Sequence, residues 1–322
     1  MDLQRLGVTN LEGVTAVVVT WNSGGLAERQ LRALEPAFAA GLRMVLFDNG
    51  SVDGSPERLA AFLAAWPFAA SVTLLRSDMN TGFCAGVNAA TTAALGADPP
   101  ANWIWMLNPD AEVSADAAQV MLDVLRETGA GVVSPGLGER HFIRVNAWPK
   151  MFWAPAQYWL TAGPHGQRWW RSGRYMGSCA LFDAEAVRQL IARDSHFQDE
   201  ALFMDGDELD VALRLRALGW DSVVAGEAAQ LHPGGPRTLA QTKVSKARQY
   251  YQSRNHAIVA RRWLPRWQFW PLLGLRMGRD LSWFARMRIA GHHPHPGAYL
   301  TGVRDALLGR TGRWAGHPPD NR

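Results

Sequence analysis

Cysteine, lysine blocks and long apolar runs are scarce in this sequence, and each scarcity argues against a class of protein. Among 322 residues there are two cysteines, Cys84 and Cys179, far apart and in apolar surroundings, so neither a disulfide framework nor a cysteine zinc site is expected. Arginines interrupt even the apolar stretch at 269–289, so no run reaches the roughly 18 to 20 apolar residues of a membrane-spanning helix. The chain is therefore not expected to span a membrane.

Charge and the first residues narrow the class further. The formal net charge is +4, arginine supplies most of the positive charge, and no basic block marks a nucleic-acid-binding tail. The lack of a basic block predicts no nucleic-acid partner. Residues 1–13 lack the apolar core of a secretory signal, and together with the two unpaired cysteines this predicts a cytoplasmic protein. A hydrophobic content of 48% is ample for a globular core.

Strand-like and helix-like patterns alternate along much of the chain. A β-branched run at 14–20 is followed by helical spacing of apolar residues at 25–40, and this pair of patterns recurs. Strands are predicted at 14–20, 44–47, 72–75, 103–107, 131–134, 175–182 and 222–225, and helices at 25–40, 56–66, 83–95, 115–127, 184–193 and 207–218. The alternation predicts an α/β fold with a mostly parallel central sheet flanked by helices.

The composition changes after Pro135 and again near residue 240. The segment that ends near Gly173 is rich in Trp, Pro, Gly and Arg, and we interpret it as a long functional loop with room for a short edge strand. From 242 onward the patterns are helical, at about 242–263, 267–290 and 297–308. The glycines and proline at 234–236 mark the best domain edge. We therefore predict an α/β domain at 1–240 and a helical extension at 241–322.

Polar residues follow the predicted strands at the positions where open α/β sheets bind ligands. Ligands lie beyond the carboxyl ends of parallel strands. Those positions hold Thr20 and Asn22, the run 48–54, the run 80–82, and the run 108–110. The G-x-G-x-x-G motif of dehydrogenase-like dinucleotide sites is missing after the first strand. Four strand ends are therefore expected to converge on one ligand-binding edge of another kind.

Some residues of this edge fit a ligand as well as a simple turn. Asp48 stands where a carboxylate could accept hydrogen bonds from a base or a ribose, although Asp-Asn-Gly-Ser is also a good turn. Asp53 is equally well placed to cap the helix that begins near Pro56. Gly82 lets the backbone approach a ligand, or makes a tight turn into a buried helix. Their convergence is a stronger signal than any one of them.

Asp110 is the candidate metal ligand. It follows the strand 103–107, which is too apolar to lie anywhere except in the centre of the sheet. Mg²⁺ and Mn²⁺ prefer hard oxygen ligands and keep several waters, so one or two carboxylates beside a diphosphate are enough. The alternative is that Asp110 caps a helix near Ser114. His232, just past the last predicted strand, is a second candidate for the metal or a phosphate, or an ordinary surface histidine.

The densest acidic cluster runs from Asp199 to Asp210 and ends in arginines. In a helix that starts at Asp207, the side chains of Asp207, Asp210 and Arg214 share one side, and Glu208 lies about 100° away. Paired carboxylates beside a sugar site suggest a general base for an acceptor hydroxyl. The alternative is a solvated helix N-terminus, where acidic residues favour the helix dipole.

Tryptophan is unusually frequent in this chain. Many of the 15 tryptophans lie beside arginines between Trp148 and Trp283, a mixture that suits a sugar-binding surface or a membrane interface. The predicted C-terminal helices could therefore rest on an anionic membrane face. A packing or dimer surface fits the same pattern equally well.

Seven blocks, taken in order, resemble the glycosyltransferase family 2 proteins of the GT-A fold, and in particular their bacterial rhamnosyltransferase-like branch. The resemblance covers about residues 14–260. It is carried by residues 17–22, 48–55, 80–83 with Gly86 and Asn88, 107–110, 177–180, 199–214 and His232. Two departures are Asn108, in place of the first carboxylate of the usual Asp-x-Asp, and Asp207-Glu208, which reverses the usual order.

The resemblance implies a fold, a reaction and a set of site residues. The α/β domain would be a GT-A catalytic domain, with the nucleotide-diphospho-sugar transferase fold. It would transfer a sugar, with inversion, from a dTDP-linked or UDP-linked donor to a polysaccharide or lipid-linked glycan. The nucleotide would lie against Thr20, Asn22, Asp48 and Asp53, and the donor site would also include Asn49, Asn80, Gly82, Asn88 and Asn108.

The remaining roles follow from the same resemblance. Asp110, with His232 as a second candidate, would hold Mg²⁺ or Mn²⁺. Glu208 would be the base, with Asp207 as the alternative. The family's acceptors place the protein in the cytoplasm, at the inner face of the cell membrane, with a homodimer as a further option.

Two other classes remain open from the sequence. A nucleotidyltransferase shares the α/β architecture and the metal requirement, but normally has a glycine-rich and basic loop after the first strand, where this chain reads Trp21-Asn22-Ser23-Gly24-Gly25. A non-catalytic carbohydrate-binding or membrane-scaffold protein would tolerate loss of the acidic cluster.

Overall fold

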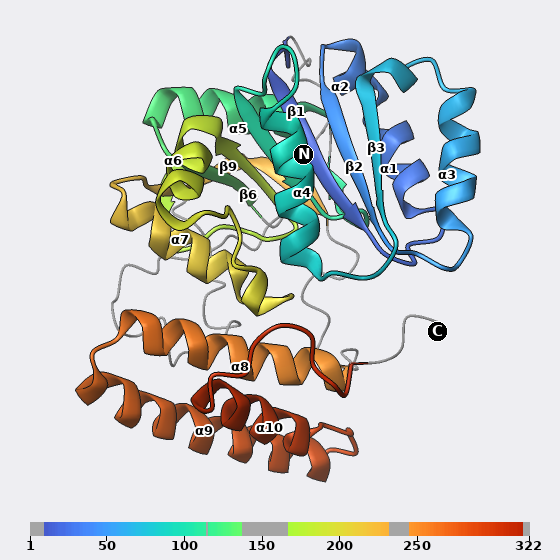
Figure 1. The fold of residues 1–322 in the computed structure, drawn as a ribbon. Helices are drawn as coiled ribbons and strands as arrows, with labels where there is room; N and C mark the ends of the chain where they lie inside the picture. Colours follow the sequence, from blue (N-terminus) through green and yellow to red (C-terminus); the bar gives the residue numbers. More distant parts are fainter. Residues whose placement is uncertain (1–9, 114, 137–166, 232–244, 318–322) are drawn as a thin grey trace.

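The computed structural model describes residues 10–113, 115–136, 167–231 and 245–317. Within this part of the chain, one nine-stranded sheet has the order β3-β2-β1-β4-β8-β6-β9-β5, with β7 beside β9 (Figure 1). The strands are β1 (Val14–Thr20), β2 (Arg43–Asn49), β3 (Val72–Ser77), β4 (Trp103–Leu107), β5 (Glu112–Val113), β6 (Val132–Gly136), β7 (Trp169–Ser172), β8 (Cys179–Asp183) and β9 (Ser222–Leu231).

The helices cover both faces of this sheet. They are α1 (Leu26–Ala33), α2 (Glu35–Ala39), α3 (Ser55–Ala64), α4 (Phe83–Leu95), α5 (Ala115–Thr128), α6 (Ala184–Asp194) and α7 (Asp207–Ala217). Apolar residues of α1, α2, α3 and α5 form one buried cluster with the sheet, and those of α4, α6 and α7 form another on the opposite face. The predicted α/β fold with a central sheet flanked by helices is confirmed.

The predicted parallel pairing holds for one half of the sheet. Strands β3, β2, β1 and β4 pair in parallel, as do β6 and β9. Beyond β4 the prediction of a mostly parallel sheet is wrong, because β8 runs antiparallel to both β4 and β6, and β5 and β7 run antiparallel to β9. An antiparallel neighbour needs no helical crossover, so helix–strand alternation in the sequence does not reveal it.

Several element boundaries differ from the predictions for local reasons. The helix predicted at 25–40 is two helices that meet at Leu34, and Pro36, which lacks an N–H donor, lies in the first turn of α2. The strand predicted at 175–182 begins at Cys179, whose N–H donates to the Met176 carbonyl in a turn. Strand β9 runs on to Leu231, beyond the predicted end at residue 225.

Three further helices form a layer below the sheet-containing part (Figure 1). They are α8 (Lys246–Trp263), α9 (Arg266–Ile289) and α10 (Pro296–Leu307), close to the three C-terminal helices predicted. Helix α8 lies nearest the sheet-containing part, and α9 and α10 lie outside it (Figure 1). The predicted domain edge near residue 240 lies outside the described residues, so the division at 240 stays a prediction. Among the described helices, none is long and apolar enough to cross a membrane.

Candidate functional site

The predicted convergence of strand ends on one edge is confirmed by the register of the sheet. Thr20 at the end of β1 pairs with Asp48 at the end of β2. Near the end of β4, Leu107 pairs with Val18 on one side and with Cys179, the first residue of β8, on the other. Residues 108–110 and the turn before β8 therefore lie beside the ends of β1 and β2.

A hydrogen-bonded corner joins the loops after β1 and β2. The Asn22 N–H donates to Ser51 Oγ at 2.8 Å, and the Val52 N–H donates to Asn22 Oδ1 at 2.9 Å. Asp48, whose exposed fraction is 2%, accepts from the Ser51 N–H at 3.2 Å and lies 3.6 Å from Arg76 Nε. The backbone φ of Asn22 is +46°, a conformation that is uncommon for residues other than glycine. The hydrogen bonds of Asn22 to residues 51 and 52 stabilise this conformation.

Asp53 links the same corner to α3. Its carboxylate accepts from the Gly24 N–H at 3.2 Å and from both the N–H and the hydroxyl of Ser55. Burial raises its pKa, but these hydrogen bonds outweigh that effect and the net pKa is lowered. Beside it a small hollow, partly open to solvent, is lined by Thr20, Ser23, Gly24, Ala27, Glu28, Asp48, Ser55, Pro56 and Leu59.

Asn49, Asn80 and Gly82 form a second, inner group. The buried Asn49 side chain accepts from the N–H and hydroxyl of Thr81 at 2.9 Å each, and donates to Asn80 Oδ1 and to the Gly82 carbonyl. Gly82 has φ of +97°, and a Cβ at this position would lie 2.6 Å from the Phe203 ring. These residues thus hold the start of α4 against the loop that carries the acidic cluster.

Asn88 holds the same loop from further along α4. Its Nδ2 donates to the Gln198 carbonyl at 2.8 Å and to Glu200 Oε1 at 2.9 Å, and its Oδ1 accepts from the Gln198 N–H at 2.8 Å. Both ends of the Asn88 amide are therefore engaged inside the protein. Direct contact of Asn49, Asn80 or Asn88 with a donor stays a prediction, whereas their support of the acidic loop is a feature of the fold.

The end of β4 brings the Asn-Pro-Asp segment next to the turn before β8. The Asn108 N–H donates to the Ser178 carbonyl at 2.9 Å, and Gln30 Nε2 of α1 donates to the Asn108 carbonyl at 2.7 Å. Asn108 Oδ1 is buried and has no hydrogen-bond partner within the described residues. Asp110 follows, half-buried. The alternative, that Asp110 caps a helix near Ser114, stays untested because Ser114 lies outside the described residues.

The metal site cannot be completed from this edge alone. Among residues 10–113, 115–136, 167–231 and 245–317, no three His, Cys, Asp or Glu side chains are grouped closely enough to hold a metal ion. His232, the second predicted ligand, lies outside the described residues. Any metal held at Asp110 would therefore take its other ligands from an amide oxygen such as Asn108 Oδ1, from a bound diphosphate, from water or from His232.

Asp207 and Glu208 begin α7, yet their surroundings differ. Asp207 has an exposed fraction of 3%, and its Oδ2 has no partner within the described chain. Burial, followed by the charges of Glu208 and Asp205, raises the pKa of Asp207 well above its usual range, and burial raises that of Asp205 to about 6. Glu208 reaches solvent, with a quarter of its side chain exposed, and lies 3.9 Å from Arg174 Nη2.

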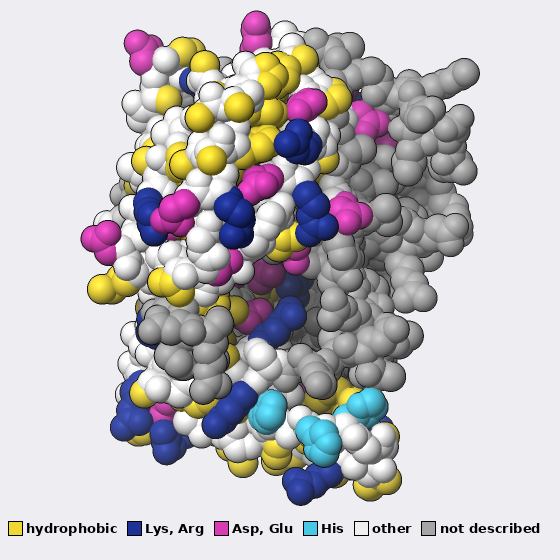
Figure 2. Space-filling model, turned by 90° about the vertical axis from the view of Figure 1, so that its right-hand side faces the viewer, with side chains coloured by type: hydrophobic (Ala, Val, Ile, Leu, Met, Phe, Trp, Pro, Cys, Tyr) yellow, Lys and Arg dark blue, Asp and Glu magenta, His cyan; other side chains and the backbone are white. Residues whose placement is uncertain are grey.

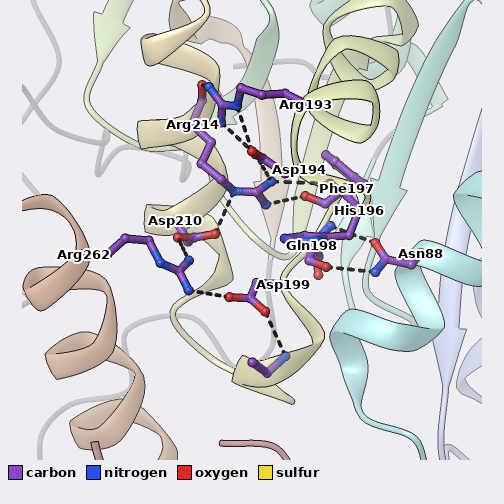
Figure 3. A network of polar contacts seen from close by, with 11 residues as sticks. Asn88, Arg193, Asp194, His196, Phe197, Gln198, Asp199, Asp210, Arg214 and Arg262 are labelled. Carbon is purple, nitrogen blue, oxygen red and sulfur yellow. Dashed lines mark hydrogen bonds and ion pairs between the residues drawn. The ribbon is translucent and has the colours of Figure 1, made fainter. Parts of the chain in front are cut away.

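Two other acids of the predicted cluster, Asp199 and Asp210, belong to a structural network (Figure 3). Asp210 accepts from Arg214 Nε at 2.8 Å and from Arg262 Nη1 at 2.7 Å, and Asp199 accepts from Arg262 Nη2 at 2.7 Å. Hydrogen bonding to Arg262 keeps the pKa of Asp199 low despite its burial. The cluster therefore divides, and Glu208 is the acid beside the Gly177 turn, with a quarter of its side chain exposed.

Helix α8 fixes the backbone just before this acid pair. Asn255 Nδ2 donates to the carbonyls of Leu202, Met204 and Asp205 at 2.7 to 2.8 Å. Arg254, almost fully buried, donates to the Leu202 carbonyl at 2.9 Å. The sequence pattern does not predict a role for these two residues. The structure shows that both hold the 202–205 backbone in position.

The last described residues return to the same edge. The Gly312 N–H donates to the Ala201 carbonyl at 2.7 Å, and the Trp314 N–H donates to the Tyr251 hydroxyl at 2.9 Å. The His317 ring lies 6.1 Å from the Trp21 ring, measured between centroids. The C-terminal segment thus joins the helical layer to the loop after β1.

Seen from one side, the space between the sheet-containing part and the helical layer is hollowed. Figure 2 shows acidic and basic side chains gathered in this hollow, with the helical layer below it. Of the basic residues near the acid pair, Arg174 was not predicted from the sequence. It stands in a Trp- and Arg-rich stretch with no motif spacing, so no sequence signal distinguished it from its neighbours.

The turn at Gly177 lies between the Asn-Pro-Asp segment and Glu208. Its neighbour Ser178 accepts from Asn108, and a Cβ at Gly177 would lie 2.6 Å from Glu208 Oε1. A methyl group there would displace the end of a flexible side chain, which costs little stability but moves the carboxylate. We expect Gly177→Ala to lower turnover about tenfold to a hundredfold, because small misplacements of a reacting group are costly.

Steady-state kinetics together with a thermal melt test this expectation. Gly278→Ala is the matched control, because nothing lies within 4 Å of a Cβ at that glycine. A Gly177→Ala protein with unchanged turnover would contradict the placement of Glu208 at the reacting centre.

Comparison with known proteins identifies relatives for this architecture. Residues 15–191 match the sequence model of the family described as Glycosyl transferase family 2. The chain is 28% identical over 243 residues to an N-acetylglucosaminyl-diphospho-decaprenol L-rhamnosyltransferase of Mycobacterium tuberculosis, which covers 67% of this chain and 74% of that protein. The predicted resemblance to the rhamnosyltransferase-like branch is confirmed.

Solved structures support the same fold. The mannosyltransferase PcManGT from Pyrobaculum calidifontis, in complex with GDP-Man and Mn²⁺, superposes with a TM-score of 0.52 at 18% identity, covering 95% of this chain and 85% of that one. S. aureus TarS in complex with UDP-GlcNAc superposes with a TM-score of 0.54 at 12% identity, covering 93% and 82%. At these identities the likeness concerns the fold, and the predicted GT-A architecture is confirmed.

Proposed function

This chain belongs to glycosyl transferase family 2 and is a glycosyltransferase, and we propose that it moves a rhamnose-like hexose, with inversion, from a dTDP-linked or UDP-linked donor to the hydroxyl of a polysaccharide or lipid-linked glycan. The family favours this function over the scaffold and nucleotidyltransferase alternatives. The lipid-linked acceptor is supported by the mycobacterial relative, whose name specifies a diphospho-decaprenol acceptor.

One observation carries the proposal. The 177–178 turn contacts both the Asn-Pro-Asp segment and Glu208, beside the corner that contains Thr20 and Asp48. The partly exposed carboxylate of Glu208, the oxygen atoms of residues 108–110 at the end of β4, and the polar hollow at Thr20 and Asp48 therefore lie at one edge of the sheet. This is the set of groups that a displacement at the anomeric carbon of a nucleotide sugar requires.

The hollow at Thr20 and Asp48 is the proposed nucleotide site. Its lining offers the Asp48 carboxylate and the hydroxyls of Thr20, Ser23 and Ser55 within a small volume. The backbone around it is held by Asn22 and Asp53, so the groups are fixed before a ligand enters. Such preorganisation lowers the entropic cost of binding.

The residues at the end of β4 fit a divalent cation. Asp110 supplies a carboxylate, and the buried Asn108 Oδ1 supplies a second oxygen, which is the donor type that Mg²⁺ and Mn²⁺ prefer. PcManGT, of the same fold, was solved with Mn²⁺. A bound cation supplies positive charge for the departing diphosphate. His232 stays a proposed second ligand.

Glu208 is the proposed base. As the acceptor oxygen attacks the anomeric carbon, the bond from that carbon to the diphosphate oxygen breaks, and the acceptor proton passes to the Glu208 carboxylate. Attack opposite to the leaving group inverts the anomeric centre, and no covalent enzyme intermediate forms. Burial, followed by the charges of Glu208 and Asp205, raises the pKa of Asp207, which favours its neutral form beside the base.

Donor binding provides a direct test. A nucleotide sugar that binds the native state at 100 times its dissociation constant stabilises the protein by about 2.7 kcal/mol. We expect a dTDP-sugar or UDP-sugar to raise the melting temperature when Mn²⁺ is present, and Asp110→Asn to remove most of the Mn²⁺-dependent part. A thermal-shift screen with and without Mn²⁺ measures both effects.

The control variant for this screen is Asp221→Asn, because Asp221 is half exposed and pairs with Arg171 on the far part of the sheet. It should respond to donor and Mn²⁺ like the native chain. If no nucleotide-diphosphate sugar stabilises the native protein, the proposed donor class is wrong.

A further inference from the structure

Helix α9 has two different sides. One side packs inside the helical layer, where Phe269, Leu272 and Leu273 join α8, and Phe284 joins Tyr299 and Val303 of α10. The other side carries large apolar residues with high exposed fractions, namely Trp267 74%, Trp270 57%, Leu275 64%, Leu281 37% and Ile289 87%. Most large exposed apolar side chains of the described chain lie on this helix.

The exposed residues form one continuous stripe. At 100° per residue, positions 267, 270, 271, 274, 275, 278, 281, 285 and 289 fall within about 80° of one direction. Gly274 and Gly278 lie in this stripe, and no described residue approaches within 4 Å of a Cβ at either position. Within the described part of the chain the stripe is therefore open along the whole helix, a length of about 36 Å for its 24 residues.

Positive charge borders the stripe. Helix α9 contains five arginines and one acid, Asp280, which pairs with Arg276 and Arg279 toward the inner side. The exposed Arg266, Arg286 and Arg288 remain along the edges of the stripe. In Figure 2 the lower part of the helical layer likewise shows basic and histidine side chains beside hydrophobic ones.

We propose that this surface of α9 docks on an anionic lipid bilayer, with the helix lying in the plane of the interface. Tryptophan and arginine are the residues that interfacial helices use, since the indole enters the headgroup region while the guanidinium meets lipid phosphates. The net charge of the helix complements the negative surface of the cytoplasmic leaflet. The surface is a convex ridge, which suits a plane of lipid rather than a short peptide.

A second copy of the chain fits this surface less well. A two-fold dimer uses the same surface on both copies. The arginines that border the stripe on one α9 helix would then lie near those of the other copy and repel them. Anionic lipid removes that repulsion. The inference goes beyond the proposed reaction, and it does not depend on which donor or acceptor the site takes.

Vesicle sedimentation tests the proposal. The full chain is expected to sediment with vesicles of phosphatidylglycerol and phosphatidylcholine, and much more weakly with phosphatidylcholine alone. Trp267→Ser with Trp270→Ser, and separately Arg286→Glu with Arg288→Glu, should each weaken binding to the anionic vesicles by about tenfold or more. Raising the salt concentration should weaken the binding as well.

The matched control is Met79→Ser, which removes an equally exposed apolar side chain, 64% exposed, from the sheet-containing part. It should bind vesicles like the native chain. The Trp and Arg variants change exposed positions and should keep the native melting temperature and the donor-induced thermal shift, which separates failure of this surface from failure of the proposed function.

Two results would overturn the proposal. One is equal sedimentation of the native chain and the Trp variant, or no sedimentation of either. The other is a native dimer that the Trp variant converts to a monomer in light scattering without any vesicle binding, because the stripe would then be an interface between copies of the chain.

Discussion

Glu208→Gln should lower turnover by about 10²-fold to 10⁴-fold, the range over which a positioned general base contributes. The amide keeps the size of the side chain and its place against Gly177, but it cannot accept the acceptor proton. Binding of the donor should change little, because Glu208 does not line the hollow at Thr20 and Asp48 that is proposed for the nucleotide. Turnover of a nucleotide sugar with a saturating acceptor, followed by release of the nucleoside diphosphate, measures the loss.

Asp207→Asn is the variant that identifies the base. Burial, followed by the charges of Glu208 and Asp205, raises the pKa of Asp207 and so favours its neutral form, which an amide closely resembles. We expect Asp207→Asn to keep turnover within about tenfold of the native value. Glu185→Gln, an exposed position at the start of α6, controls for the loss of a carboxylate elsewhere. The reverse ranking of the two variants would make Asp207 the base.

Arg214→Met should destabilise the protein by about 3 to 5 kcal/mol, which is the typical cost of breaking a buried ion pair by removal of one partner. Arg214 is 5% exposed and donates to Asp210 and Asp194 and to the carbonyls of His196 and Phe197. Asp210 is fully buried, and the methionine would leave it with Arg262 as its remaining partner (Figure 3). Urea unfolding followed by circular dichroism measures the change.

The control for this variant is Arg171→Met. Arg171 pairs with Asp221 at 2.8 Å, but its side chain is 67% exposed, and exposed ion pairs contribute about 0 to 1 kcal/mol. A loss of less than about 1 kcal/mol for Arg214→Met would mean that the network does not hold the acidic loop. The hydrogen bond from Arg193, and the one from Arg214, lower the pKa of Asp194 to about 2, so Asp194 itself is charged at neutral pH.

Elements with one strong pattern were predicted with accurate bounds. Helix α4 and strand β4 begin and end at the predicted residues. The small residues of α4 and the unbroken apolar run of β4 each allow a single interpretation. Where local pattern and long-range pairing differ, the prediction was wrong. The direction of β8 and the extension of β9 depend on neighbouring strands that lie far away in the sequence.

The site shows the same division. Its position at the carboxyl ends of β1, β2 and β4 follows from the strand pattern, because parallel strands end on one edge. The partners of each polar residue do not follow. Asn88 meets Gln198 and Glu200 across more than a hundred residues, and Arg262 of α8 reaches both Asp199 and Asp210.

Residue order alone was therefore enough for the fold class and the edge of the sheet where chemistry can occur, which short-range periodicity and turn residues encode. It was enough for the family as well, through the resemblance that seven ordered blocks of residues carry. The tertiary structure decided which members of the acidic cluster are engaged by arginines, which one is buried with a raised pKa, and which one is partly exposed at the Gly177 turn. Burial and charge pairing arise between segments distant in the chain, so Asp and Glu residues of one cluster acquire different surroundings and different roles only once the chain has folded.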